Sequence, residues 1–210
     1  MELRYSVFST TLGWAGVLAS QKGLLNLVLP QSSWRKAVSL LEGFALRWRD
    51  RTLREAEAAD FGDLPERIRD YLDGKPVVFH DKLDLSSASA FQRRVWEADC
   101  SIPYGETRTY SWVASRVGLP KAARAVGQAL AKNPLPIIIP CHRVICSNGD
   151  LGGFSGGRDW KQRLLQIEAA HGAICAGDQL VDSRQQGEPR TKSLLKFQIA
   201  FTQYLTQLTR

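Results

Sequence analysis

The sequence lacks the features that mark a membrane-spanning or exported protein. None of its 210 residues belongs to an apolar run long enough to cross a bilayer. The uncharged stretch between Arg4 and Lys22 ends in a signal-like VLAS, but it is interrupted by Ser6, Ser9, Thr10, Thr11 and Gly13, so we expect no secretory signal.

Cysteine and histidine are also scarce. The chain has four cysteines with no C-x-x-C pair and three histidines with no zinc-finger spacing, so we expect neither a structural metal nor any cofactor. Without an export signal, free thiols in a reducing cytoplasm are the expected state. The cysteines are Cys100, Cys141, Cys146 and Cys175.

Charge is distributed unevenly along a chain of ordinary globular composition. Residues 1–105 hold 14 basic and 14 acidic side chains, whereas residues 106–210 hold 14 and 7, so the net charge of +7 lies in the second half. This asymmetry indicates a polyanionic partner, either nucleic acid or an anionic membrane, although a solvated basic surface has the same composition.

Residues 1–82 have the pattern of a small α+β domain. Short β-type runs at residues 5–8 and 24–29 are followed by a helix that Ser32 or Ser33 can cap. Residues 65–72 form a second, shorter helix that ends at Gly74. The apolar stripe of the first helix is Trp34, Val38, Leu41 and Ala45.

Residues 83–176 read as a mainly helical domain. Ser86 or Ser87 opens a helix that ends before Pro103. Residues 109–117 and 121–132 then form two helices around a Gly-containing turn, which is the outline of a helix-turn-helix. Residues 177–210 are predicted to be partly helical.

The second helix of this pair has two faces when projected at about 100° per residue. One face would pack on its partner helix, and the other is basic with small residues between the charges, as suits close approach to a nucleic acid. An ordinary amphipathic surface helix has the same pattern. The packing face is Ala122, Ala123, Val126, Ala129 and Leu130, and the basic face is Lys121, Arg124, Gln128 and Lys132.

The candidate nucleophile is Cys141, which follows a proline-rich apolar run. Pro136 and Pro140 disfavour a regular strand and favour a turn, in which His142 can take the thiol proton. Arg143 adds positive charge that would favour the thiolate. A buried structural cysteine is the alternative.

An acid that could complete a relay is Glu168. In the helix predicted around residues 159–170 it falls on the apolar stripe, and a buried carboxylate needs a partner. His142 is the candidate partner and His171 its local competitor, unless the carboxylate reaches out to water.

A glycine-rich loop at residues 152–157 (GGFSGG) matches the G-x-S-x-G pattern of serine hydrolases. The turn at residues 147–150 stands where such a nucleophile elbow needs a strand, which disfavours Ser155 as a nucleophile. The loop is better suited to be a wall beside Cys141, with Phe154 as an aromatic face for a flat ligand.

Together these residues resemble the O6-alkylguanine-DNA alkyltransferases, or methylated-DNA–protein-cysteine methyltransferases. The resemblance is strong from about residue 83 to residue 172 and weaker before it. Phe154 departs from the tyrosine of many members, and Trp112 is unusually bulky. The matching segments are residues 102–107 (IPYGET), 109–110 (TY), 122–127 (AARAVG), 133–134 (NP), 139–144 (IPCHRV), 152–157 (GGFSGG), 160–161 (WK), 164–165 (LL) and Glu168.

The resemblance implies a role for each matched residue. Cys141 would accept the alkyl group, His142 would be the base acting through a water, and Glu168 would orient it. Asn133 would brace the turn, and Tyr110 would act on the base ring nitrogen and the target's phosphate. Arg124 would fill the gap that the flipped nucleotide leaves, with its helix in the minor groove. The other DNA contacts would come from Lys121, Ala123, Gln128 and Lys132, and the base pocket would be lined by Pro136, Arg143, Val144, Gly152, Phe154 and Ser155.

It also implies the fold and the partner. We expect a ribonuclease-H-like N-terminal domain over residues 1–82, a winged-helix-like DNA-binding domain over residues 83–176, and an extension over residues 177–210. The partner would be double-stranded DNA containing O6-alkylguanine or O4-alkylthymine, bound by a monomer, with cooperative assembly left open. A helix-turn-helix protein that binds DNA without chemistry is the competing interpretation.

Overall fold

The structure is a computed structural model that describes residues 1–48 and 51–177, the last seven of these by their backbone alone. The predicted extension from residue 178 onward lies outside the described residues, and so does the side chain of His171. Within the described part of the chain, no helix is both long and apolar enough to cross a membrane.

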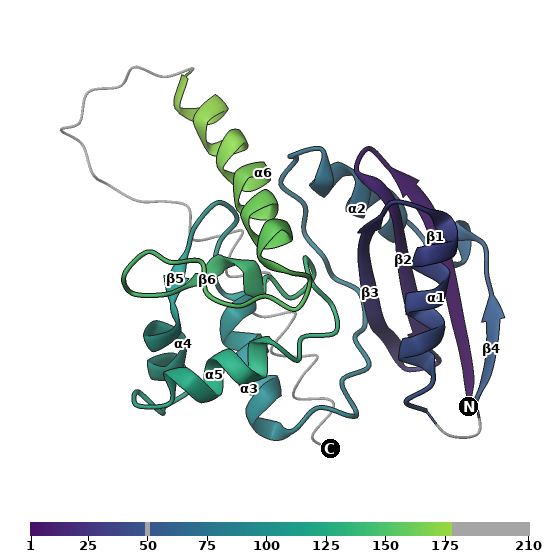
Figure 1. Cartoon of the computed structure of the whole chain (residues 1–210), viewed down its shortest axis with the longest axis horizontal. Helices are drawn as coiled ribbons and strands as arrows, with labels where there is room; N and C mark the ends of the chain where they lie inside the picture. The colour runs from purple at the N-terminus through teal and green to yellow at the C-terminus, as the bar shows by residue number, and fades with distance from the viewer. Residues whose placement is uncertain (49–50, 178–210) are drawn as a thin grey trace.

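A four-stranded sheet forms the first half of the chain (Figure 1). Its strands are β1 (Glu2–Thr10), β2 (Gly13–Ser20), β3 (Gly23–Gln31) and β4 (Thr52–Glu55). The order is β3-β2-β1-β4, with antiparallel pairs except for β1 and β4, which run parallel.

The sheet is buried on both faces. Successive side chains of a strand point to opposite sides, so its apolar residues divide between two cores. Leu18, Leu25 and Val28 pack under α1 (Trp34–Ala45). Val17 and Leu24 on the other face join a larger core. That core is shared with α2 (Leu64–Leu72), which follows the short helix η1 (Ala58–Phe61), and with the second half of the chain.

The predictions for the first half need three corrections. Strand β2 was not predicted, because burial on both faces removes the alternation that marks a strand, and β4 is too short and exposed to give a signal. Trp34 is 38% exposed rather than part of the core stripe, since it is the first residue of α1. Ser33 does cap α1, accepting a hydrogen bond from the Lys36 N–H.

The second half is mainly helical. Its helices are α3 (Ala90–Cys100), α4 (Tyr110–Arg116), α5 (Ala123–Leu130), η2 (Cys141–Arg143) and α6 (Arg158–Gly177). Two short strands, β5 (Arg108–Thr109) and β6 (Val144–Ile145), pair in parallel and tie the start of α4 to the residues after Cys141.

Two predicted boundaries in this half were wrong. Helix α3 is capped by Ser89 in a reciprocal box with Gln92, not by Ser86 or Ser87, because Ser86 is held in a turn by Asp84. Helix α5 is shorter than residues 121–132. Its predicted packing face is buried at Val126, Ala129 and Leu130 but only partly at Ala122 and Ala123.

The two halves are joined along β3. The backbone of Leu24 exchanges hydrogen bonds of 2.7 Å with Lys82 and Asp84, and the Leu27 N–H donates to the Pro134 carbonyl at 3.0 Å. The exposed edge of β3 is thereby covered by the segments that lead into α3 and toward Cys141.

Candidate active site

Cys141 lies in a single 3-10 turn, as the preceding Pro136 and Pro140 predict, and its side chain is only 3% exposed. Asn133 holds this turn from inside. Its amide donates to the Ile139 carbonyl at 2.8 Å and to Cys141 Sγ at 3.0 Å, and its Oδ1 accepts from the Leu135 N–H at 2.9 Å. Ile137 in the same loop has a φ of 73°, a conformation that is costly for a β-branched residue.

The surroundings of Cys141 favour the thiol over the thiolate in the resting protein. Burial, followed by the nearby Asp99, raises the pKa of Cys141 to about 12, although Asn133 and Lys161 oppose the shift. The sequence predicted that positive charge near Cys141 would favour the thiolate, but burial outweighs that charge in the unbound protein. A base must take the proton as the sulfur reacts.

Glu168 is 1% exposed and sits at the centre of a network of donors. Its Oε1 lies 2.8 Å from His142 Nε2 and accepts from Arg143 Nη2 at 2.9 Å. Its Oε2 accepts from the Gly105 N–H at 2.9 Å and from Arg143 Nε at 3.0 Å. Burial alone would raise the pKa of Glu168, but the hydrogen bonds and charges of His142 and Arg143 lower it to about 2.

His142 is fully buried, and burial lowers its pKa, although Glu168 acts in the opposite direction. Among the described residues no hydrogen bond joins His142 to Cys141, and its Nδ1 is a buried atom without a partner there. The pairing of His142 with Glu168, predicted from the helical stripe, is present in the structure.

Arg143 does not lie where the resemblance placed it. Instead of lining a base pocket, its buried guanidinium binds Glu168 and donates to the Ile102 carbonyl at 2.6 Å. The positive charge of Arg143, two residues after Cys141, thus stabilises the carboxylate of Glu168.

Three buried polar groups near the site were missed. Tyr71 in α2 contacts both Glu168 and His142. Lys161 is fully buried and donates to the Val144 carbonyl at 2.6 Å, while Asp99 is fully buried with no hydrogen-bond partner among the described residues. Lys161 shares the helical stripe of Leu164 and Glu168, which could have revealed it; the pattern around Tyr71 indicates only core packing.

Tyr110 begins α4 and is packed between two glycines. A β-carbon at Gly152 would lie 2.6 Å from the Tyr110 hydroxyl, and one at Gly127 would lie 3.6 Å from its ring. Gly152 also has a φ of 69°, which a side chain would strain. Phe154 is partly buried against the same core.

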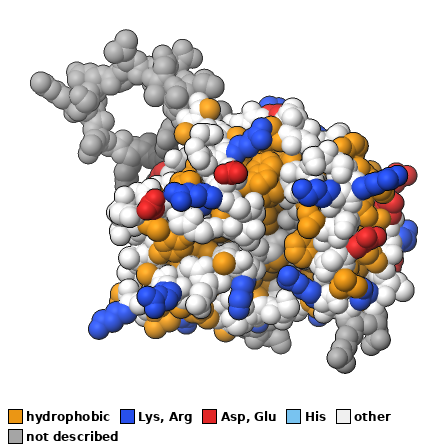
Figure 2. Space-filling view, in the orientation of Figure 1, with side chains coloured by type: hydrophobic (Ala, Val, Ile, Leu, Met, Phe, Trp, Pro, Cys, Tyr) orange, Lys and Arg blue, Asp and Glu red, His pale blue; other side chains and the backbone are white. Residues whose placement is uncertain are grey.

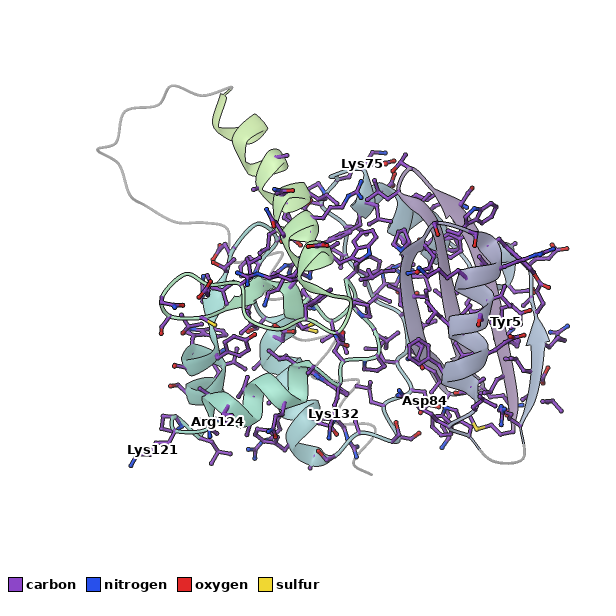
Figure 3. All side chains as sticks on the ribbon, in the orientation of Figure 1. Tyr5, Lys75, Asp84, Lys121, Arg124 and Lys132 are labelled. Atoms are coloured by element: carbon purple, nitrogen blue, oxygen red, sulfur yellow. The ribbon has the colours of Figure 1, made fainter. Side chains whose placement is uncertain are left out.

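The basic side chains predicted on α5 and at its ends face solvent. Lys121, Arg124, Gln128 and Lys132 are all exposed. Figure 3 shows Lys121, Arg124 and Lys132 along one lower edge of the molecule, and Lys and Arg side chains lie along the same edge in the space-filling view (Figure 2). Ala123 is partly buried at the start of α5.

A groove of about 810 Å³ separates this helical half from β3 and α1. Of the predicted base-pocket residues, Pro136 and Ser155 line it, together with Asn133, while Val144, Gly152 and Phe154 do not. Its remaining wall includes Phe44, Trp48, Trp96 and Trp160.

Ser155 shows no sign of being a nucleophile. It is exposed, and within the part of the chain that the structure describes it has no hydrogen bond to a histidine. The same described residues contain no cluster of three or more His, Cys, Asp or Glu side chains that could hold a metal ion.

These features define a helix-turn-helix protein that carries a buried cysteine beside a His–Glu–Arg cluster. The family description "6-O-methylguanine DNA methyltransferase, DNA binding domain" matches residues 90–170. The methylated-DNA–protein-cysteine methyltransferase of Mycolicibacterium paratuberculosis is 50% identical over 111 residues, which is 53% of this chain and 67% of that protein. That of Methanosarcina barkeri is 48% identical over 108 residues, or 51% and 68%.

Solved structures extend the similarity to the first half of the chain. The Mycobacterium tuberculosis O6-methylguanine methyltransferase has a TM-score of 0.64 at 30% identity, over 92% of this chain and 99% of that one. The M. tuberculosis OGT in complex with DNA has a TM-score of 0.63 at 35% identity, over 80% and 94%. The chain belongs to the methylated-DNA–protein-cysteine methyltransferase family.

Proposed function

We propose that this protein repairs alkylated DNA by direct reversal, with Cys141 as the acceptor of an alkyl group from O6 of guanine and from O4 of thymine. The observation that carries the proposal is the juxtaposition of Cys141, in a turn braced by Asn133, with the buried His142–Glu168 pair. Both lie in the same helical domain as the exposed basic side chains of α5.

The reaction forms one bond and breaks one. Cys141 Sγ attacks the alkyl carbon, a thioether forms, and the bond from that carbon to the base oxygen breaks. The thiol proton moves to His142, whose imidazolium is stabilised by the ionised Glu168. The nucleobase leaves as an anion and takes up one proton, which balances the proton that the thiol gave up. A thioether has no leaving group that would restore the thiol, so each molecule acts once.

The target base must leave the stack before the sulfur can reach it, because Cys141 is buried. Arg124, exposed on α5, would fill the gap that the flipped nucleotide leaves in the minor groove. Lys121, Gln128 and Lys132 would contact the backbone, and Ala123 would allow close approach. Tyr110 would act on the base ring and the target's phosphate.

Several broader expectations belong to the same proposal. The first domain, residues 1–82, would have a ribonuclease-H-like layout, and residues 83–176 a winged-helix-like one. The protein would act as a monomer. Cys100, Cys141 and Cys146 are free thiols, which suits a reducing cytoplasm.

The direct test uses a duplex that contains one O6-methylguanine and mass spectrometry of the protein. A single methyl group is expected on Cys141, present in Cys146→Ala, which keeps the acceptor, and lost in Cys141→Ala. Tight binding of the duplex with no mass change in the unmodified sequence would instead identify a DNA-binding protein without chemistry.

A further inference from the structure

Tyr71 is a side chain of the N-terminal domain that reaches the candidate relay of the C-terminal domain. It lies near the end of α2 and is 1% exposed. Its ring packs edge-on against Tyr104, with centroids 5.8 Å apart, and against His142 at 6.3 Å. The ring is therefore held in place independently of its hydroxyl group.

The Tyr71 hydroxyl closes a triangle of three polar atoms. It donates to Glu168 Oε1 at 2.5 Å and lies 3.0 Å from His142 Nε2. The third side is the 2.8 Å contact between His142 Nε2 and Glu168 Oε1. All three side chains are buried, so water does not compete for these contacts.

The protons in this triangle can be assigned by counting donors. Glu168 is ionised, because its pKa is lowered to about 2, so it can only accept. The single proton of Tyr71 goes to Glu168, and the remaining lone pairs of the hydroxyl face His142. Nε2 therefore meets two acceptor oxygens and must carry the ring proton, which leaves Nδ1 unprotonated.

We propose that Tyr71 is a positioning residue of the alkyl-transfer site: together with Glu168 it holds His142 in the Nε2–H tautomer, so that Nδ1 is the nitrogen that takes the proton of the acceptor thiol. This inference rests on the proposed function. Nδ1 is buried and has no hydrogen-bond partner among the described residues. Its lone pair is therefore available to accept the thiol proton.

The hydroxyl keeps its proton over the working pH range, because burial and the neighbouring Glu168 raise the pKa of Tyr71 well above 10. Other charged or titratable groups around His142 and Cys141 come from the turn itself and from α3 and α6. The charged ones are Arg143 beside Glu168 and Lys161 on α6, and the titratable groups that stay mostly neutral near pH 7 are Asp99 and Cys100 on α3.

The first test compares Tyr71→Phe with Tyr104→Phe in single-turnover transfer from an O6-methylguanine duplex. Tyr104 is a matched control, since it is a neighbouring tyrosine whose hydroxyl donates to the Gly74 carbonyl at 3.1 Å. We expect Tyr71→Phe to lower the rate about tenfold near neutral pH, with unchanged duplex affinity. The defect should narrow toward about pH 9.5, because hydroxide then replaces the base.

The second test reads the tautomer directly by ¹⁵N NMR of histidine-labelled protein. The chain has only three histidines, so a His142→Gln sample assigns the His142 signals. The unmodified protein should show a protonated Nε2 and an unprotonated Nδ1, and Tyr71→Phe should show a mixture of the two tautomers. A Tyr71→Phe protein with the original rate, pH profile and spectrum would overturn the role of Tyr71.

Failure of this inference is distinguishable from failure of the proposed function. If the unmodified protein transfers no methyl group, the proposed function is wrong. If it transfers and Tyr71→Phe behaves like Tyr104→Phe, only the assignment of Tyr71 is wrong. Should Tyr71→Phe not fold, 3-fluorotyrosine at position 71 keeps the shape and alters the hydroxyl, and an unchanged His142 spectrum would then contradict the proposal.

Discussion

Two regions of the same core each bury a carboxyl group, and the pKa of that group is shifted in opposite directions. Glu168 receives hydrogen bonds from the side chains of Tyr71, His142 and Arg143 and from one backbone N–H, and its pKa falls to about 2. Asp99 on α3 is equally buried, has no hydrogen-bond partner among the described residues, and its pKa rises to about 8 through loss of solvation.

The comparison shows that donors, rather than burial, decide the charge of a buried acid. Solvation is lost at both positions, but only Glu168 has replaced it with protein donors. At neutral pH Glu168 is therefore an anion that can stabilise an imidazolium, whereas Asp99 is mostly a neutral acid near Cys141. Four substitutions test this contrast, in order of expected effect.

Glu168→Gln should have the largest effect. It leaves the Arg143 guanidinium buried without its counter-charge, which costs about 4 kcal/mol of stability. Alkyl transfer should fall at least about 100-fold, because the imidazolium of His142 loses its anion. Chemical denaturation and single-turnover kinetics measure the two effects. Glu106→Gln, which breaks an exposed ion pair with Arg108, should change stability by less than about 0.5 kcal/mol. If Glu106→Gln destabilised the protein as much as Glu168→Gln does, burial of the ion pair would not explain the loss.

Arg143→Lys keeps the charge but not the geometry. Arg143 binds both oxygens of Glu168 and the Ile102 carbonyl, and an ammonium cannot reproduce this set of contacts. We expect a loss of about 2 kcal/mol in urea denaturation. Arg163→Lys, an exposed position on α6 next to Trp160, is the control and should be nearly neutral.

Asp99→Ala should stabilise the protein. The unfolded chain releases the Asp99 proton near its ordinary pKa of 3.8, whereas the folded protein retains it up to about 8, so folding becomes less favourable as the pH rises between these values. Removing the carboxyl should gain about 2 kcal/mol at pH near 7.5, after allowance for the small cavity. An alanine variant that is less stable than the original would mean that Asp99 has a partner.

Asp99→Asn should have a small effect on stability near pH 4 and its clearest effect on the pH dependence of stability. The amide does not titrate, so the decline in stability between about pH 4 and about pH 8 should flatten, while the value near pH 4 changes by less than about 1 kcal/mol. Below about pH 4 both proteins should lose stability alike, because the lowered pKa of Glu168 stabilises the fold only while its carboxyl is ionised. Thermal unfolding measured across the pH range checks the behaviour both above and below about pH 4.

Part of the site could be predicted because its signal is local in sequence. Cys141 and His142 are adjacent, the prolines that precede them indicate a turn, and Glu168 interrupts an apolar stripe where a charge is costly. The fold was harder, since β2 is buried on both faces and has no alternation. Tyr71 could not be found, because its hydroxyl meets Glu168 only through the packing of one domain on the other.

Ile137, in the loop that delivers Cys141, has a φ of 73°, and the Asn133 amide donates to the Ile139 carbonyl in the same loop. A catalyst of many cycles would have to regain such an unfavourable geometry after every event. A protein that reacts only once needs this loop conformation for a single event, so the loop does not have to return to it after the transfer.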